Sequence, residues 1–403
     1  MSVPVLPPDN KPPTGTVPEI TPGELLTLMD RGVPLQVLDV RDPARVAAGR
    51  IELPGGSLFF NIPGSRLLAI TDFGPTGIDP HVPLVVVCGH GNDSRLCAAH
   101  LNRLGGSAVS LVGGMASWMA LVVAREVPPP PGLDRLVQMD RIGKGSLGYI
   151  LIKGGEAIVI DPGRDSGPWL DILGGSPAKP VAVADTHIHA DYVSGGSSLA
   201  RLLGVPYCIH PADSLSPFDG RGGRLDYRPL AEGMSIPLGG SEVRVMHTPG
   251  HSPGSVTFMV GMSAGFTGDF MFMDSLGRPD IADRSEEWAA DLWRSIARVK
   301  STWPPGILIF PAHYVSAREK NSSHLVCGTL RDVVARNASL RFTDESEFRA
   351  WVRASSTSIP SAYRLIKEIN LGLSSASIEE MDLLEAGKNE CAITGAPPAA
   401  SQF

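Results

Sequence analysis

The sequence lacks three features, each of which is typical of a particular class of protein. No apolar stretch approaches the roughly 20 residues that a helix needs to cross a bilayer. No run of basic residues occurs and the formal net charge is −7, so the electrostatic footprint of a nucleic-acid binder is missing. The five cysteines show no disulfide-framework spacing, as is typical of a reducing compartment. We therefore expect a cytosolic protein that binds neither nucleic acid nor a membrane.

What is present favours a chain of several folded parts. The 403 residues favour two or three domains, and an apolar content of 43% is enough for ordinary cores. The 45 glycines and 36 prolines predict many tight loops. Residues 1–17 are polar and proline-rich without the apolar core of a signal peptide, which predicts a disordered leader. Residues 395–403 are expected to form a loose tail.

The clearest predicted boundary is a proline run. Residues 127–132 read Val-Pro-Pro-Pro-Pro-Gly, and four prolines continue neither a helix nor a central strand. We predict a linker there, with a first domain at 18–126 and a second at 133–394 that ends in a helical extension. Within the first domain, strands, a helix and a further strand follow one another, which predicts a parallel α/β sheet. These segments are Gln36–Val40, Leu84–Val87, Ser94–Leu104 and Ala108–Val112.

Two helices are predicted in the second domain. Residues Glu286–Val299 place apolar side chains on one helical face. Residues Tyr363–Asn370 form the second helix, which we expect to be the last of the chain, with Gly372 close to its end.

Histidine or aspartate follows a short apolar run at four places in this domain. Loops at strand ends, held by a rigid sheet, are where α/β proteins gather functional groups. Four such ends within one segment predict a metal site. The runs and the side chains after them are Val181–Ala184 before His187, His189 and Asp191, Val243–Met246 before His251, Ala264–Phe266 before Asp269, and Ile307–Phe310 before His313.

The ligand types leave two metals open. Two imidazoles and one carboxylate on a single face, with positions free for O₂ and a substrate, suit a non-haem Fe(II) oxygenase. Three histidines with a water molecule suit catalytic zinc.

Residues 141–313 resemble the metallo-β-lactamase superfamily. The motifs that carry the resemblance are Ile160-Asp161-Pro162-Gly163, His187-x-His189-x-Asp191, His251, Asp269 and His313, in family order. The resemblance is strongest to the persulfide dioxygenases of the glyoxalase-II-like branch. It implies an αββα sandwich in which His187, His251 and Asp269 bind one Fe(II) per chain, with Zn as the alternative metal.

Two-metal members of that family would use more of these side chains. By resemblance, His189 would join the first metal, while Asp191, the residue after it and His313 would bind a second, with Asp269 bridging. Here the residue after Asp191 is Tyr192, where those enzymes carry histidine. A phenol with an ordinary pKa near ~10 is a poor replacement for a neutral nitrogen. We therefore favour one metal, which makes His189, Asp191 and His313 supporting residues or remnants of a second site.

A cysteine ends a buried-type strand in the first domain. Cys88 follows Leu84–Val87, and Gly89 to Ser94 curl toward a helix N-terminus, an environment that lowers a thiol pKa. Together with Asp39-Val40-Arg41-Asp42 and Gly113-Gly114, this loop resembles a rhodanese domain, which implies a parallel α/β sandwich with Cys88 as sulfur carrier. Asp93 departs from the arginine that many rhodaneses carry there.

The resemblances together imply a persulfide dioxygenase that oxidises glutathione persulfide, or a similar small persulfide, with O₂ to sulfite. Sulfur transfer through Cys88 would be coupled to it, and Arg278 and Tyr314 are candidates for binding the anionic thiol. One alternative is a glyoxalase-II-like thioester hydrolase that uses a metal-bound hydroxide. A second is a binding protein without catalysis, in which the metal site is degenerate.

Overall fold

The computed structural model describes residues 17–281, 284–387 and 389–393. The predicted tail at 395–403 and, apart from Val17, the predicted leader at 1–17 lie outside the described residues. The chain forms two compact units, the first made mainly of residues up to Leu121 and the second mainly of residues from Val122 onward.

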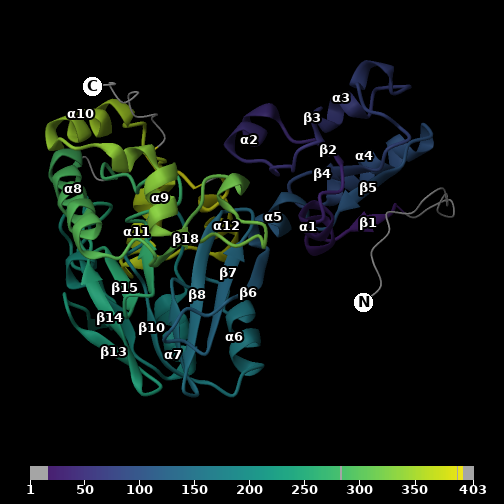
Figure 1. Ribbon diagram of the computed structural model, residues 1–403. Helices are drawn as coiled ribbons and strands as arrows, with labels where there is room; N and C mark the ends of the chain where they lie inside the picture. Colours follow the sequence, from purple (N-terminus) through teal and green to yellow (C-terminus); the bar gives the residue numbers. More distant parts are fainter. Residues whose placement is uncertain (1–16, 282–283, 388, 394–403) are drawn as a thin grey trace. The chain divides into compact units, whose positions relative to one another are not determined.

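The first unit is built on a parallel sheet, as predicted (Figure 1). Its strands pair in the order β1-β5-β4-β2-β3, and every pair is parallel. The central strands are buried on both faces, which is why they read as continuous apolar runs. The strands are β1 (Glu19–Ile20), β2 (Gln36–Asp39), β3 (Leu58–Asn61), β4 (Leu84–Val87) and β5 (Ala108–Leu111).

Helices connect these strands and cover the sheet. The predicted helix at Ser94–Leu104 is α4 (Asn92–Arg103), which packs Cys97, Ala98 and Leu101 against the strands. The other helices of this unit are α1 (Pro22–Asp30), α2 (Pro43–Ala48), α3 (Gly64–Leu67) and α5 (Gly114–Ala120).

The junction between the units differs from the predicted one. Residues Val122–Val127 form β6, an edge strand of the second unit's sheet, so the boundary predicted at residue 126 falls inside a strand. The proline run therefore joins β6 to its neighbour β7 (Arg135–Arg141) and is not a spacer between domains. Prolines without a backbone N–H suit such a connection between strands as well as a linker, and sequence alone does not separate the two.

Two sheets form the centre of the second unit (Figure 1). The first has the order β12-β11-β10-β9-β8-β7-β6 and the second the order β13-β14-β15-β16-β17-β18. The strands not yet given are β8 (Ser146–Lys153), β9 (Glu156–Ile160), β10 (Lys179–Ala184), β11 (Tyr207–Ile209), β12 (Arg228–Pro229), β13 (Ser235–Leu238), β14 (Ser241–His247), β15 (Val256–Val260), β16 (Ala264–Gly268), β17 (Leu308–Pro311) and β18 (Gly328–Thr329).

Aromatic side chains join the two sheets. The ring of Tyr149 on β8 lies 4.9 Å from that of Phe266 on β16 and 5.7 Å from that of Phe310 on β17. On the outer face of the first sheet, Trp169 and Leu199 pack from α6 (Gly167–Gly174) and α7 (Gly196–Leu203). The predicted amphipathic helix is α8 (Ser285–Thr302), which lies with the second sheet. These four layers confirm the predicted αββα sandwich.

The C-terminal extension is helical but longer than predicted. It contains α9 (Leu330–Arg336), α10 (Glu345–Ser355) and α11 (Ala362–Asn370), which matches the predicted last helix. A further helix, α12 (Ile378–Leu384), follows it and corrects that prediction. A capping box between Ser377 and Glu380 begins α12, and none of its residues is buried. Its sequence therefore shows little of the apolar periodicity on which helix prediction depends.

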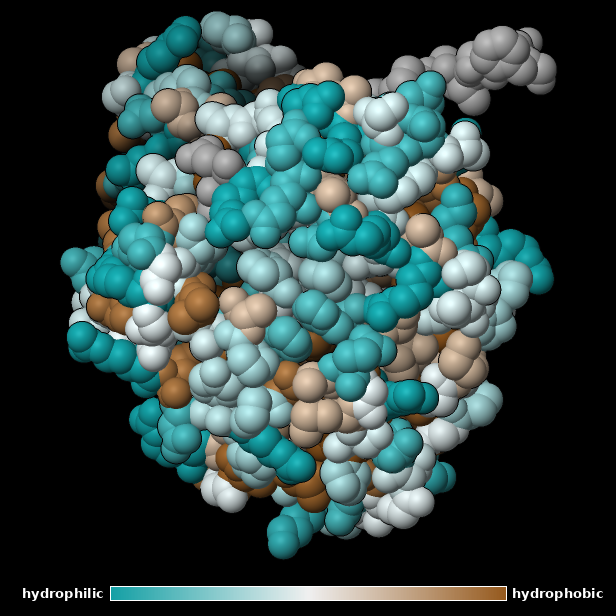
Figure 2. Space-filling view, turned by 90° about the vertical axis from the view of Figure 1, so that its left-hand side faces the viewer, coloured by the Kyte–Doolittle hydropathy of each residue, from teal (hydrophilic) through white to brown (hydrophobic). Residues whose placement is uncertain are grey.

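Figure 2 shows one face that is mostly hydrophilic, with hydrophobic residues scattered over it. Among the described residues, no helix has both the length and the hydropathy that a bilayer crossing requires.

Candidate metal centre and cysteine pocket

The four predicted strand ends all carry their histidine or aspartate in the loop that follows. His187 comes after β10 of the first sheet, whereas His251, Asp269 and His313 come after β14, β16 and β17 of the second. Asp213 ties two of these loops together, because its carboxylate accepts from the backbone N–H of Ile188 at 2.8 Å and from Ser252 Oγ at 2.8 Å. Both sheets thus contribute to one buried group of polar side chains.

His187, His251 and Asp269 converge on one point. Their three ligand atoms lie within 4.8 Å of one another. Asp269 Oδ2 is 3.7 Å from His187 Nε2 and 3.5 Å from His251 Nε2, too far for hydrogen bonds. All three atoms are buried and none has a hydrogen-bond partner among the described residues. Buried polar atoms are normally satisfied, so this set fits an ion bound between the three side chains.

Hydrogen bonds at the far side of each imidazole favour metal binding. His251 Nδ1 donates to the Arg278 carbonyl at 3.0 Å, which leaves the Nε2 lone pair free. His187 Nδ1 lies 3.1 Å from Thr186 Oγ1, whose own proton goes to Asp161 at 2.9 Å, so this ring also presents Nε2. Burial lowers the pKa of both histidines, which favours the neutral form that a metal requires.

The second oxygen of Asp269 is engaged elsewhere. Asp269 Oδ1 lies 2.5 Å from His313 Nδ1, and His313 Nε2 lies 3.0 Å from Asp191 Oδ2. Burial opposes protonation of His313, but the two carboxylates outweigh it and raise the pKa of His313 to about 10. His313 thus lies between the two carboxylates and holds the second oxygen of Asp269 in place.

His189 belongs to a separate cluster. Its Nε2 lies 3.2 Å from Asp161 Oδ1, and Asp161, Asp185 and His189 together form a second group with metal-ligand spacing. The carboxylates are already engaged, since Asp161 accepts from the backbone N–H of Thr186 at 2.7 Å and Asp185 from Tyr207 OH at 2.7 Å. Burial disfavours the protonated form of His189, but the hydrogen bond to Asp161 outweighs this effect and raises the pKa of the imidazole. Through the bonds from Thr186 to Asp161, this cluster holds the loop that carries His187.

Tyr192 lies against the rings of His189 and His313. Its ring stacks on that of His189 at 4.3 Å and 27°, and it meets His313 edge-on at 5.8 Å. The side chain is 1% exposed, and its hydroxyl has no hydrogen-bond partner among the described residues. A phenol therefore fills the position at which the two-metal pattern carries an imidazole.

Two residues of α11 that sequence reasoning missed also face this region. Asn370 Nδ2 donates to the carbonyls of His189 at 2.9 Å and Tyr192 at 2.8 Å, and its oxygen accepts from Ser194 N–H at 2.9 Å. Lys367, one turn earlier, is 3% exposed, and burial lowers its pKa against the opposing influence of Asp213 and Asp269. A spacing of three residues places Lys367 and Asn370 on the same face of a helix, and this could be seen in the sequence. The sequence does not show which part of the protein that face contacts.

Arg278 and Tyr314 hold internal positions. The guanidinium of Arg278 pairs with Asp280 at 2.6 Å and donates to the Thr357 carbonyl at 2.6 Å. The hydroxyl of Tyr314 donates to Asp140 at 3.0 Å. Both side chains are buried and already paired, so their predicted role in binding an anionic thiol gains no support from these contacts.

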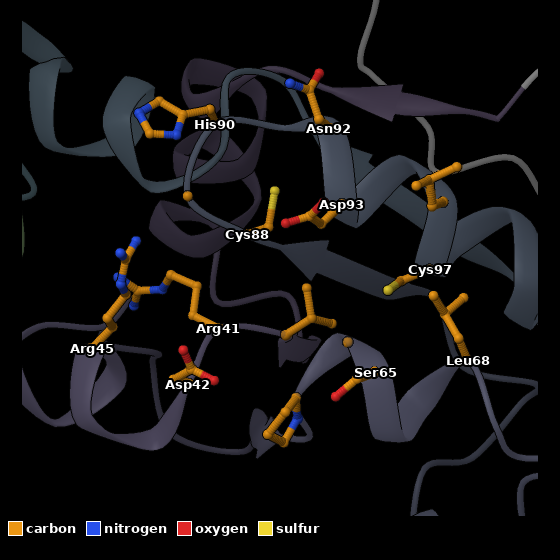
Figure 3. A pocket seen from close by; sticks show the side chains of 15 residues that line it. Arg41, Asp42, Arg45, Ser65, Leu68, Cys88, His90, Asn92, Asp93 and Cys97 are labelled. Atoms are coloured by element: carbon orange, nitrogen blue, oxygen red, sulfur yellow. The ribbon is translucent and has the colours of Figure 1, made fainter.

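Cys88 opens into a cavity of about 480 Å³ in the first unit (Figure 3). Its sulfur accepts from the backbone N–H of Gly91 at 3.1 Å and lies 3.3 Å from Ser94 Oγ. Gly114, at φ +59°, allows the next loop to pack against this one, since a Cβ there would lie 2.4 Å from the Cys88 carbonyl oxygen. The predicted cradle around a strand-end cysteine is therefore present.

Comparison with known proteins decides the family. The family model for the metallo-beta-lactamase superfamily matches residues 143–313. An uncharacterized protein of Mycobacterium bovis (strain ATCC BAA-935 / AF2122/97) is 32% identical over 191 residues, which cover 41% of this chain and 84% of that protein. The chain belongs to the metallo-beta-lactamase superfamily. Residues 21–121 match the rhodanese-like domain, so both predicted resemblances are confirmed.

Two relatives of this superfamily member carry names that state an activity. Persulfide dioxygenase ETHE1, mitochondrial, of Homo sapiens is 32% identical over 160 residues, 39% of this chain and 59% of that protein. Hydroxyacylglutathione hydrolase of Anaeromyxobacter dehalogenans (strain 2CP-C) is 31% identical over 180 residues, 44% of this chain and 64% of that protein. The chain spans less than two thirds of either relative, and their similar identities do not choose between the two activities.

Solved structures agree on the fold of the superfamily. A metallo-beta-lactamase from Staphylococcus aureus subsp. aureus COL gives a TM-score of 0.52 at 24% identity, covering 60% of this chain and 73% of that one. ETHE1 from Myxococcus xanthus gives 0.50 at 18% identity, covering 62% and 100%.

Proposed function

We propose that the chain is a persulfide dioxygenase with one Fe(II) held by His187, His251 and Asp269. The observation that carries the proposal is the convergence of three buried ligand atoms without hydrogen-bond partners among the described residues. Two imidazoles and one carboxylate are the ligand set of non-haem Fe(II) oxygenases. The similarity to a persulfide dioxygenase of Homo sapiens supports the same activity.

Iron held there would supply the redox chemistry by which O₂ oxidises the outer sulfur of glutathione persulfide to sulfite. The remaining functions fall to the protein. Thr186 and the Arg278 carbonyl fix the two imidazoles, and His313 fixes Asp269. Burial of the group excludes water, so competing hydrolysis is suppressed.

Lys367 is the residue that we assign to the anionic end of the substrate. Its side chain is buried on α11, near enough to Asp213 and Asp269 for their charges to oppose the lowering of its pKa. No hydrogen bond or ion pair to its ammonium group occurs among the described residues. A buried ammonium without a partner is costly, and an incoming carboxylate or persulfide anion would satisfy it.

The rhodanese-like domain is proposed to move sulfane sulfur through Cys88. The carrier would be a Cys88 persulfide, stabilised by the Gly91 N–H and Ser94 hydroxyl beside it. Joining both activities in one chain would raise the effective concentration of the small sulfur compounds that pass between the two sites. The cytosol suits both steps, because thiols stay reduced there.

A thioester hydrolase is the second candidate, and the similarity to hydroxyacylglutathione hydrolase favours it. Such an enzyme would use zinc to lower the pKa of a bound water. Metal content together with thioester cleavage separates the two candidates.

The decisive experiment begins with protein purified without oxygen. Elemental analysis should give about one iron per chain, and glutathione persulfide should drive O₂ uptake with sulfite as product. His251→Ala should lose the iron and about 10²-fold or more of the rate. His100→Ala is a matched control, because this histidine belongs to the first unit, where its Nε2 lies 3.0 Å from the Ile70 carbonyl oxygen. Bound zinc with rapid thioester cleavage and no O₂ uptake would contradict the proposal.

A further inference from the structure

The cavity around Cys88 has carboxylates on both of its walls. Asp42 and Asp93 line it, and Figure 3 shows Asp93 reaching from the α4 side toward the sulfur. Arg41 and Arg45 line the other wall together with Asp42. The balance of charge in the cavity therefore depends on how far these two arginines are already neutralised.

Arg41 is neutralised inside the protein. Its Nη2 pairs with Asp39 at 2.7 Å and also donates to the Gly49 carbonyl at 2.6 Å. Arg45 has no ion-pair partner among the described residues. His90 also lines the cavity. With this histidine counted as neutral, the carboxylates of Asp42 and Asp93 outnumber the one guanidinium without an ion pair, so the cavity carries an excess negative charge before the sulfur itself ionises.

We propose that Cys88 passes sulfane sulfur to a small thiol that carries an ammonium group, in preference to anionic thiols. This inference rests on the proposed sulfur transfer and names its substrate class. An ammonium group near Asp93 gains Coulomb energy, whereas a carboxylate there is repelled. Leu68 and Leu96 at the rim offer apolar contact to the short carbon chain of such an aminothiol.

The transfer step balances without an outside reagent. The thiolate of the acceptor attacks the outer sulfur of the Cys88 persulfide. The bond between that sulfur and Cys88 Sγ breaks, and its electron pair remains on Sγ, which takes up the proton that the acceptor lost. The acceptor leaves as a persulfide. The Gly91 N–H, 3.1 Å from Sγ, stabilises the departing thiolate.

The test uses the full chain under anaerobic conditions, so that no O₂ consumes the product. Cys88 is loaded with inorganic polysulfide, and loss of one sulfur atom is followed by intact-protein mass spectrometry with cysteamine, 2-mercaptoethanol or 3-mercaptopropionate as acceptor. Asp93→Asn should lower the ratio of the cysteamine rate to the mercaptopropionate rate by about threefold to tenfold. Because the same two thiols are used with the wild type and with the variant, differences in their intrinsic reactivity do not affect the change in this ratio.

Three controls complete the experiment. Asp72→Asn removes the same charge outside the cavity, where Asp72 accepts from the Gly74 N–H at 2.9 Å, and should leave the ratio unchanged. Salt of about 1 M screens the charges, so it should lower the ratio of the cysteamine rate to the mercaptopropionate rate for the wild-type protein. If Asp93→Asn does not fold, Asp42→Asn should shift the ratio in the same direction. An unchanged ratio in the folded variant would overturn the inference, whereas a wild-type persulfide that reacts with none of the thiols would overturn sulfur transfer itself.

Discussion

The candidate metal centre differs from the two-metal pattern in one side chain, because a tyrosine stands where that pattern has a histidine. Tyr192 follows Asp191 directly, is buried, and stacks on His189. A phenol offers no neutral nitrogen to a metal. Asp191 and His313 then pair with each other at 3.0 Å.

Replacement of Tyr192 by histidine should restore a second site. We expect Tyr192→His to raise the metal content from about one to about two ions per chain, because a fourth group would join Asp191, His313 and Asp269. Elemental analysis of dialysed protein measures this directly. Tyr192→Phe keeps the ring without the hydroxyl and should remain near one ion. A histidine variant that also holds one ion would show that Tyr192 does not limit the metal content.

Single residues also mark what the sequence could not reveal. The strand-end histidines and aspartates were found because their positions follow from apolar runs. Arg278 was expected at a substrate pocket, but its pairing with Asp280 depends on a turn that no pattern specifies. Lys367 was missed because its burial depends on where α11 packs.

At the scale of elements, α11 supports the metal-binding loop. Asn370 makes three hydrogen bonds to backbone groups of His189, Tyr192 and Ser194. The helix itself was predictable from its sequence. Its contact was not, because the partners lie more than 170 residues earlier in the chain and a helical pattern carries no information about distant loops.

Removal of this contact should weaken both the fold and the metal site. Asn370→Ala leaves two buried carbonyls and one N–H without partners, so we expect the free energy of unfolding to fall by about 2–4 kcal/mol. Urea unfolding followed by circular dichroism measures the change, and the variant should also lose metal faster to a chelator.

Arg364→Ala on the exposed side of the same helix provides the comparison. Its exposed side chain makes surface pairs with Asp219 and Glu368 and lies 5.5 Å from the centre of the Phe218 ring, so its effect should stay within about 1 kcal/mol. An equal loss of unfolding free energy in both variants would mean that the hydrogen bonds of Asn370 do not contribute to stability.

At the scale of the whole molecule, the two units have separate hydrophobic cores. The cluster of the first unit includes Leu38, Val86 and Leu101, and those of the second unit share no residue with it. Only the second unit holds the three candidate metal ligands. The sequence predicted this division into two parts, but it placed the junction at the prolines because a strand at the edge of a sheet has a weak signature.

Metal removal should therefore affect one of two thermal transitions. We expect a chelator to lower the melting temperature of the second unit by roughly 5–10 °C, because an ion that binds only the folded state stabilises it. The melting temperature of the first unit should not change. Val86→Ala, which opens a cavity in the first core, should move that transition alone, and calorimetry resolves the two. One transition that responds to both changes would contradict this expectation.

The position of β6 has a practical consequence for anyone who separates the two halves. A cut at the prolines would remove Val122–Val127 from the sheet to which it belongs and leave β7 as an edge strand paired only with β8. The unpaired backbone groups of β7 would then be open to association with other chains. A cut next to Leu121 keeps β6 paired with β7. Aggregation after cleavage at the prolines would therefore reflect the choice of cleavage site and not an inability of the second unit to fold alone.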